Sequence, residues 1–275
     1  MQFLLGLALA ISIATIALRA RSLSRGGAYA AALVGTVIFG IGGWQWAILL
    51  LTFFISSSAL SQTFERQKRG LDDKYSKVGG RDAAQVFSNG GLPALFAFSH
   101  FLFPHDLWPW IGFAGALAAV NADTWATELG VLNPTPPRLI TDLRRRVEKG
   151  TSGGVSFAGT LASLAGSALI AALAALLSPH PYHLSSPALS EVEGFFVLIG
   201  LITFFGFCGA LFDSLLGATV QAMYFCPKDQ KETEQHPLHT CGTQTVHLRG
   251  WKWLNSDWVN AACGAVGAGL ALILI

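Results

Sequence analysis

Charged residues are scarce in this chain of 275 residues. They make up 12% of the sequence, whereas a soluble domain carries about 25%. Hydrophobic residues reach 52%, and the mean hydropathy is +0.49. The chain has no long basic tract, which argues against a nucleic-acid partner. This composition excludes an ordinary soluble domain. It predicts an all-α, polytopic integral membrane protein with a single transmembrane domain over residues 1–275.

Three other signatures are also missing. The four cysteines include no Cys-x-x-Cys pair, and no Walker A order of residues is present. The first apolar run has no basic residue before it and no small-residue cleavage site after it, so we expect it to remain as the first helix. Cys226 and Cys241 do flank a polar loop that contains His236 and His239. A zinc site there is conceivable, although the spacing fits no standard pattern.

Apolar runs predict about eight transmembrane helices, since a helix needs roughly 20 apolar residues to cross a bilayer. The runs cover residues 2–18, 28–42, 44–61, 83–102, 108–129, 154–178, 194–225 and 257–275. The seventh exceeds one straight span, which indicates a tilted or projecting helix. All 18 lysines and arginines follow the first, third, fifth and seventh runs. Because positive residues mark cytoplasmic loops, we expect both termini to be non-cytoplasmic.

The most informative polar stretch is residues 121–130, at the end of the fifth apolar run. On a helical projection its polar side chains fill one arc of roughly 160°. Charge inside a membrane is unfavourable and indicates a functional site, although the pattern also fits a solvated helix end. Asp213 repeats the pattern in the seventh run, and Asp257 opens the eighth. The arc contains Asn121, Asp123, Thr124, Thr127 and Glu128.

Two glycine-containing loops enter helices on the predicted cytoplasmic side. Arg81, Gln85 and Asn89 follow the first loop at spacings of four, so they share one helix face. This pattern is typical either of a phosphate-facing stripe or of a helix start with an arginine that reaches the membrane surface. The second loop, residues 149–156, joins Lys149 to hydroxyls and three glycines. Such a turn can bind an anion, although Gly-Thr-Ser-Gly-Gly is also an ordinary loop.

Taken together, these segments resemble the transmembrane protein 19 family, whose plant member is a phytyl-phosphate kinase of vitamin E synthesis. The resemblance covers nearly the whole chain. The transmembrane protein 19 family is also distantly similar to polyprenol kinases and CTP:phosphatidate cytidylyltransferases. Ser152 stands where many members are expected to have asparagine. The segments that carry the resemblance are residues 79–86 with 89–91, 121–130, 150–156, 213–218 and 255–260.

The resemblance implies a kinase at the cytoplasmic face of the lipid bilayer. It would transfer a phosphoryl group from a nucleoside triphosphate, expected to be CTP, to an isoprenyl monophosphate such as phytyl or geranylgeranyl phosphate. Phosphoryl transfer needs a metal ion, cations and alignment of donor and acceptor, and Mg²⁺ prefers carboxylates with water and phosphate oxygens. A monophosphate acceptor is already an anion, so no general base is required.

The kinase activity that the resemblance implies also indicates the site residues. We expect the catalytic residues to be Asp123, Glu128, Asp213 and Lys149. Mg²⁺ or another divalent cation is expected at Asp123, Glu128 and Asp213, with Asn121 and Asp257 as additional ligands. Nucleotide and phosphates are expected at Arg81, Gln85, Asn89, Gly150, Thr151, Ser152, Gly153, Gly154 and Asn260.

Three alternatives remain open at this point. A cytidylyltransferase acting on a lipid phosphate would release pyrophosphate. An ion-coupled transporter would also place acids in broken helices, but these acids cluster at one face. A scaffold without chemistry would leave the acids unexplained. The prenyl chain length, the nucleotide base, the choice of monophosphate or free alcohol, and the oligomeric state are open as well.

Overall fold

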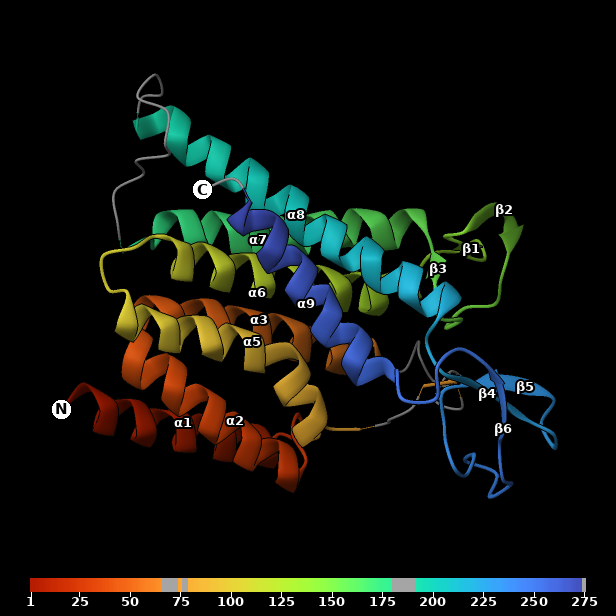
Figure 1. Ribbon diagram of the computed structural model, residues 1–275. Coiled ribbons are helices and arrows are strands. Elements are labelled where there is room, and N and C mark those ends of the chain that lie inside the picture. Colours follow the sequence, from red (N-terminus) through yellow and green to blue (C-terminus); the bar gives the residue numbers. More distant parts are fainter. Residues whose placement is uncertain (66–73, 76–78, 180–190, 274–275) are drawn as a thin grey trace.

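A bundle of long helices carries two small sheets at one end (Figure 1). This computed structural model describes residues 1–65, 74–75, 79–179 and 191–273. The helices lie where the apolar runs predict them, which confirms the all-α class. They are α1 (Gln2–Arg19), α2 (Arg25–Val37) with a π-helical extension η1 (Ile38–Gly42), α3 (Trp44–Thr63), α5 (Ala83–Leu102), α6 (Trp108–Gly130), α7 (Phe157–Leu176), α8 (Glu191–Thr219) and α9 (Ser256–Leu272).

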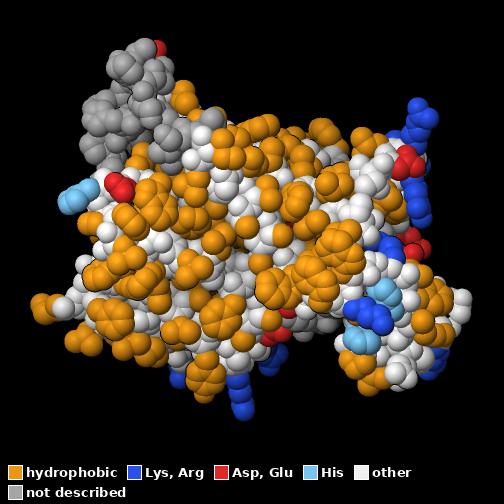
Figure 2. Space-filling view, in the orientation of Figure 1, with side chains coloured by type: hydrophobic (Ala, Val, Ile, Leu, Met, Phe, Trp, Pro, Cys, Tyr) orange, Lys and Arg blue, Asp and Glu red, His pale blue; other side chains and the backbone are white. Residues whose placement is uncertain are grey.

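Five helices of the described chain are long and apolar enough to cross a membrane: α1, α2 with η1, α3, α7 and α8. Figure 2 shows hydrophobic side chains over the side of the bundle, while lysines and arginines gather toward the end with the sheets and along the lower edge. Leu4, Leu95 and Phe101 are among the large apolar side chains exposed on the helices. A surface of this kind is suited to lipid. The start of α1 and the last turn of α9 lie toward the end away from the sheets (Figure 1).

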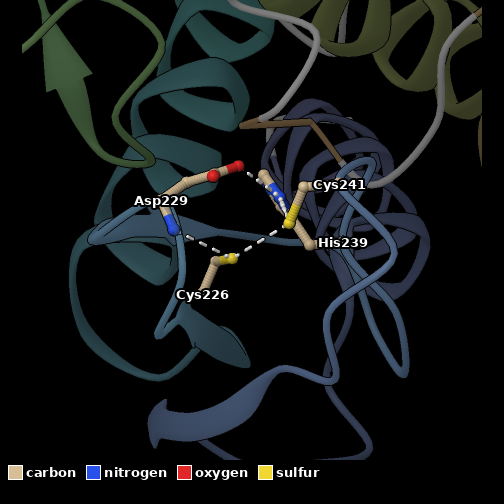
Figure 3. Close-up of side chains that lie close together, drawn as sticks. All are labelled: Cys226, Asp229, His239 and Cys241. Atoms are coloured by element: carbon tan, nitrogen blue, oxygen red, sulfur yellow. Dashed lines mark hydrogen bonds and ion pairs between the residues drawn. The ribbon is translucent and has the colours of Figure 1, made fainter.

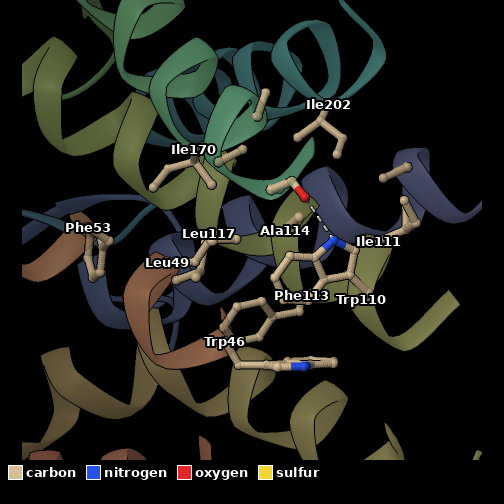
Figure 4. Packing of buried hydrophobic residues seen from close by; sticks show 14 of the residues in the cluster. Trp46, Leu49, Phe53, Trp110, Ile111, Phe113, Ala114, Leu117, Ile170 and Ile202 are labelled. Carbon is tan, nitrogen blue, oxygen red and sulfur yellow. Dashed lines mark hydrogen bonds between the residues drawn. The ribbon is translucent and has the colours of Figure 1, made fainter. Parts of the chain in front are cut away.

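Helix α6 forms the centre of the bundle. It packs against α3, α5, α7, α8 and α9, and every residue from Pro109 to Ala122 is buried. Trp46 of α3 packs edge-on against Trp110 of α6, with ring centroids 5.0 Å apart. The ring centroid of Phe113 lies 4.7 Å from that of Trp46. The Trp110 indole N–H donates to the Ala174 carbonyl at 3.1 Å (Figure 4). The core thus fixes the part of α6 that is distant from the sheets. The polar last turns of α6 lie outside this core and are available to form a site.

The two sheets were not anticipated from the apolar runs. The first has the order β2-β1-β3 and the second β5-β4-β6, all antiparallel. Their strands are β1 (Arg138–Leu139), β2 (Asp142–Arg146), β3 (Gly154–Val155), β4 (Met223–Cys226), β5 (Lys231–Thr233) and β6 (Val246–Arg249). The apolar run that was expected to continue as helix to residue 225 therefore ends at Thr219, because its last residues pair in β4.

Helix starts are fixed by side-chain caps. Asp82 caps α5 in a reciprocal capping box with Gln85, which satisfies two backbone donors. Ser156 caps α7 by accepting from Gly159 N at 3.1 Å. For α9 the cap is Asn255, whose side chain accepts from Trp258 N at 3.2 Å.

Candidate functional site

Two carboxylates from different helices meet near the sheet-bearing end of the bundle. Asp123 on α6 and Asp213 on α8 interact electrostatically with each other, and both interact with Glu234 from the segment after β5. The thiol of Cys263 on α9 also lies within reach of both aspartates. Three helices and one loop therefore converge on what we call the acidic centre: Asp123, Asp213 and Glu234.

Small residues one helical turn below the acidic centre explain why the aspartates meet. A Cβ atom added at Gly209 would lie 2.6 Å from Ala119 Cβ and 2.8 Å from the Cys263 carbonyl oxygen. Only glycine allows so close an approach of α8 to α6 and α9. Asp123 follows Ala119, and Asp213 follows Gly209, by four residues. Residues four apart share a helix face, so this contact places both carboxylates at the same level.

One oxygen of the acidic centre lacks a partner. Asp213 Oδ2 is buried and has no hydrogen-bond partner among the residues that the structure describes. A buried polar atom without a hydrogen bond is rare and unfavourable, more so for a charged group. The neighbouring Asp123 and Glu234 add negative charge. This donor set of carboxylate oxygens with an unsatisfied oxygen fits a hard divalent cation such as Mg²⁺.

The glycine-rich loop before α7 lies against the next turn of α8. A Cβ atom at Gly217 would lie 3.0 Å from Gly153 N, and one at Gly153 would lie 2.5 Å from Ala218 Cβ. Gly150 and Gly153 have positive φ angles of 79° and 81°, which glycine adopts without penalty. Gly154 N donates to the Thr151 carbonyl at 3.0 Å and closes the turn. The loop therefore stands one turn beyond Asp213, on the side of the acidic centre.

Glu234 joins this loop to the end of α8. Ser152 Oγ donates to Glu234 Oε1 at 2.8 Å, and Gln221 Nε2 donates to the same oxygen at 2.8 Å. Arg249 from β6 interacts with Glu234 and donates from Nη1 to the Gly217 carbonyl at 3.1 Å. Burial lowers the pKa of Arg249, an effect that Glu232 and Glu234 oppose and Arg145 reinforces. The acidic centre thus has one cation at its rim.

Sequence reasoning missed Glu234, Gln221 and Arg249. They lie in connections without helical or strand periodicity, and no motif marks them. The only available signal was the concentration of polar residues between the last two apolar runs. The contacts of Ser152 with Glu234 and Gln221, and of Arg249 with the Gly217 carbonyl, depend on the pairing of β4 with β5 and β6.

Lys149, predicted to be catalytic, is directed elsewhere. Its Nζ donates to the Val131 carbonyl at 2.8 Å, at the carboxyl end of α6. A lysine there stabilises the unpaired carbonyls of the helix terminus. In this arrangement Lys149 attaches the glycine-rich loop to the end of α6.

Glu128 and Asn121 face α3 rather than the acidic centre. Ser61 Oγ donates to Glu128 Oε1 at 2.6 Å. The Asn121 amide accepts from Ser56 at 3.3 Å and donates to the Gly166 carbonyl at 2.7 Å. The predicted metal set is therefore divided between two faces of α6. Asp123 and Asp213 are brought together, whereas Glu128 and Asn121 are held by other contacts.

Asp257 and Asn260 lie at the start of α9, three residues apart and on one helix face. Cys263 continues that face by another three residues and lies near both aspartates. Cys263 places α9 beside the acidic centre, and the roles expected of Asp257 and Asn260 stay predictions.

An apolar cavity opens between α1, α2, α3 and α5. It has about 660 Å³ of empty space, including the part open to the surroundings. Its polar lining consists of Arg81, Gln85 and Asn89, and the remaining side chains that line it are apolar. Arg81 precedes α5 rather than lying in it. The three residues predicted to share one face nevertheless line the same cavity.

Arg81 lines this cavity, and two hydrogen bonds fix its backbone. Its N–H donates to the Ser22 carbonyl at 2.9 Å, and its carbonyl accepts from Ser24 N at 3.0 Å. The guanidinium carbon lies 5.4 Å from the ring centroid of Phe53, a cation–π distance. Burial lowers the pKa of Arg81 to about 10, while the Glu128 carboxylate opposes that shift. A desolvated cation at the end of an apolar cavity suits an amphiphile with an anionic head.

Apolar helices with an acidic centre at one end define a polytopic integral membrane protein with a polar site at the ends of its helices. The family described as "Integral membrane protein DUF92" matches residues 8–268, and the chain belongs to this family. This confirms the resemblance inferred from the sequence motifs.

Curated relatives of the chain come from plants, archaea and cyanobacteria. The chain is 35% identical to Protein PGR of Arabidopsis thaliana over 245 residues, with 82% of each chain covered. It is 34% identical over 203 residues to Uncharacterized membrane protein MJ0933 of Methanocaldococcus jannaschii, covering 73% of this chain and 75% of the relative. It is 25% identical over 250 residues to Uncharacterized membrane protein sll0875 of Synechocystis sp., covering 87% and 78%. No solved structure matches.

Proposed function

We propose that the chain is a membrane phosphotransferase that moves the terminal phosphoryl group of a nucleoside triphosphate, CTP in particular, onto an isoprenyl monophosphate. The observation that supports this most strongly is the position of α6, which lies between the acidic centre and the cavity that ends at Arg81. The first suits a metal–triphosphate, and the second suits a lipid phosphate.

The polar arc of α6 connects the two regions. From Asp123 to Glu128 the helix turns about 140° net and rises about 7.5 Å. Thr124 and Thr127 lie between them on the projection. Asp123 faces α8 and α9, while Glu128 interacts with Arg81. A phosphate held at Arg81 would reach the acidic centre along this polar surface without crossing apolar side chains of α6.

The lipid would enter from the bilayer. Its prenyl chain would lie in the apolar cavity between α1, α2, α3 and α5, where burial of apolar surface is favourable. The monophosphate would accept hydrogen bonds from Arg81 and from the amides of Gln85 and Asn89. Arg81 is desolvated, which strengthens its attraction to a phosphate.

On the other side, Asp123 and Asp213 would hold a divalent cation, with Glu234 beside them. Held by these carboxylates, a cation such as Mg²⁺ would supply positive charge that offsets the charge of the nucleotide phosphates. Backbone N–H groups of residues 150–154 that do not close the turn itself would face the phosphates, and Arg249 would add positive charge at the rim. Asp257 and Asn260 on α9 would complete the polar wall.

The reaction itself needs little covalent chemistry from the protein. An oxygen of the isoprenyl monophosphate attacks the terminal phosphorus, the bond from that phosphorus to the bridging oxygen breaks, and the nucleoside diphosphate leaves. The attacking oxygen is already ionised at neutral pH, so no side chain must remove a proton. The work of the protein is to position the two phosphates and to stabilise the spreading negative charge.

The test is a product analysis with purified, detergent-solubilised protein. It is incubated with Mg²⁺, each nucleoside triphosphate labelled at the terminal phosphate, and a panel of prenyl alcohols and monophosphates. We expect label in an isoprenyl diphosphate together with a nucleoside diphosphate. Formation of a CDP-lipid with pyrophosphate would replace the kinase by the cytidylyltransferase alternative. Vesicle uptake of a substrate without nucleotide turnover on any acceptor would favour a transporter.

A further inference from the structure

A cluster of four metal-binding side chains lies outside the acidic centre. Cys226, Asp229, His239 and Cys241 each offer one ligand atom, and these four atoms lie within 4.8 Å of one another (Figure 3). They belong to the second sheet and its loops, which we call the β4–β6 module (residues 223–249). Cys226 and His239 are buried. We propose that this cluster is a structural zinc site.

The distances agree with tetrahedral coordination. Cys226 Sγ lies 3.5 Å from Cys241 Sγ. His239 Nδ1 lies 3.3 Å from Cys241 Sγ and 3.1 Å from Asp229 Oδ2. With Zn–S of about 2.3 Å and Zn–N or Zn–O of about 2.0–2.1 Å, a regular tetrahedron has edges of about 3.8 Å between sulfurs and about 3.5 Å between sulfur and nitrogen. The three short separations are a few tenths of an ångström below these edges and the other pairs lie within 4.8 Å, so small movements of the side chains would seat the ion.

Two tight turns present the ligands in pairs. In the first, Gln230 N donates to the Cys226 carbonyl at 2.9 Å, and Asp229 N points at Cys226 Sγ from 3.5 Å. In the second, Gly242 N donates to the His239 carbonyl at 2.8 Å. A backbone N–H directed at sulfur stabilises the thiolate that a metal requires. Each turn thus contributes one sulfur and one harder ligand to a common point.

The chemistry of the set selects zinc. Two thiolates favour a soft or borderline ion over Mg²⁺ or Ca²⁺, and a tetrahedral set of sulfur, nitrogen and oxygen is typical of Zn²⁺. The sequence alone suggested His236 beside His239. In the structure His236 stacks on Tyr224 with ring centroids 4.4 Å apart, and Asp229 takes the remaining position. The four ligands follow no standard spacing, because two of them come from a turn that closes only when β4 and β5 pair.

The position of the site indicates what the ion does. The β4–β6 module is too small to bury a substantial core, and domains of this size commonly depend on metals. Glu234 lies in the connection between the two ligand-bearing turns, and Arg249 ends the module at β6. Glu234 belongs to the acidic centre, and Arg249 lies at its rim. By cross-linking the two turns, zinc would hold Glu234 and Arg249 in place. The ion itself would be structural.

The experiment measures metal directly on full-length protein purified in detergent without chelators. Inductively coupled plasma mass spectrometry should find about one zinc per chain, and X-ray absorption at the zinc edge should show two sulfur and two nitrogen or oxygen ligands. Cys226→Ser and Cys241→Ser should bring the zinc content to background. Cys208→Ser, a cysteine of α8 outside the cluster, should retain it. Equal zinc in all three variants would overturn the proposal.

A second measurement does not depend on variants with a weakened site. Cobalt added to chelator-treated wild-type protein should give the thiolate charge-transfer and visible absorption of a tetrahedral two-sulfur site. Asp229→Cys adds a third sulfur, so the charge-transfer intensity should rise by roughly half. Failure of the wild type to bind cobalt or zinc, or a Cys226–Cys241 disulfide in protein isolated under reducing conditions, would contradict the zinc site.

Discussion

At the scale of single residues, the acidic centre depends on two aspartates that repel each other. Asp123 and Asp213 approach because their helices are packed tightly, and Asp213 Oδ2 has no hydrogen-bond partner in the described part of the chain. Natural proteins retain such unfavourable groups where they serve function. The surplus negative charge is relieved either by a cation or by removal of one carboxylate.

We therefore expect Asp123→Asn and Asp213→Asn each to lower phosphotransferase activity by at least about 10²-fold, the effect of removing one preorganised electrostatic group. The melting temperature without metal should stay the same or rise, because a like-charge contact is lost. Initial rates and thermal unfolding measure the two effects. Asp106→Asn, an exposed acid in the connection before α6, is the control. Full activity in either site variant would exclude that residue from catalysis.

Arg81 and Glu128 form the second residue-scale unit, and their roles separate in a double variant. Arg81→Gln should raise the KM for the prenyl phosphate and lower stability, because Glu128 loses its cation. The loss should be smaller than the about 3–5 kcal/mol found for fully buried pairs, since Ser61 still donates to Glu128 in the variant. Adding Glu128→Gln should restore the melting temperature while the KM remains high. Recovery of both would show that Arg81 is structural, and Arg144→Gln, exposed in β2, serves as control.

The residues of the site were only partly predictable. Asp123 and Asp213 stand out because charges in apolar runs are rare, and Arg81, Gln85 and Asn89 because they recur every four residues. The separation of Asp123 from Glu128 and Asn121 on two faces of α6 was not predictable, since a helical projection gives angles and not neighbours. Contacts across the fold, such as that of Ser61 with Glu128, decide which neighbour a polar group finds.

At the scale of elements, close contacts of α6, α8 and α9 set the geometry of the acidic centre. Small residues occur at these crossings: Gly267 of α9 lies where a Cβ atom would be 2.5 Å from Ala119 Cβ of α6, and Gly206 of α8 where it would be 2.8 Å from Ala118 Cβ of α6. Such contacts replace the hydrophobic driving force that helices lack within lipid. The side chains on them are too small to absorb an added methyl group by changing rotamer.

Gly209→Ala should therefore be destabilising by about 1–3 kcal/mol, the range for overpacking, and should also lower activity by moving Asp213 away from Asp123. Gly200→Ala, in the same helix, is the matched control. No described atom lies within 4 Å of a Cβ placed there, so the better helix propensity of alanine should leave stability equal or slightly higher. Thermal unfolding of the two variants gives the comparison. Equal melting temperatures would contradict the packing account.

Helices were predicted closely because long apolar runs determine them, and the seventh was overextended only where β4 begins. The two sheets escaped prediction because their strands have two to five residues. Segments this short carry no periodicity, and their pairing comes from the loops that surround them. The cluster of Cys226, Asp229, His239 and Cys241 was hidden for the same reason.

At the scale of the whole molecule, the basic loops predict one orientation in the membrane. Epitope tags at either terminus or after Asp106 should be accessible from the non-cytoplasmic side of sealed cells. A tag after Arg145 should require permeabilisation. The reason is that all lysines and arginines follow alternate apolar runs, and cytoplasmic loops retain positive charge. Accessibility of the Arg145 tag in sealed cells would reverse the orientation and move the acidic centre to the other face.

The central claim is that Asp123 and Asp213 together bind a divalent cation, and magnesium-dependent stability tests it most directly. A ligand that binds only the folded state stabilises it by about 2.7 kcal/mol at a hundred times its Kd. Thermal unfolding of purified protein across a Mg²⁺ titration should therefore show a rising Tm for the wild type and for Asp106→Asn. Asp123→Asn and Asp213→Asn should show no rise. A Tm response to Mg²⁺ in both aspartate variants equal to that of the wild type would contradict the account.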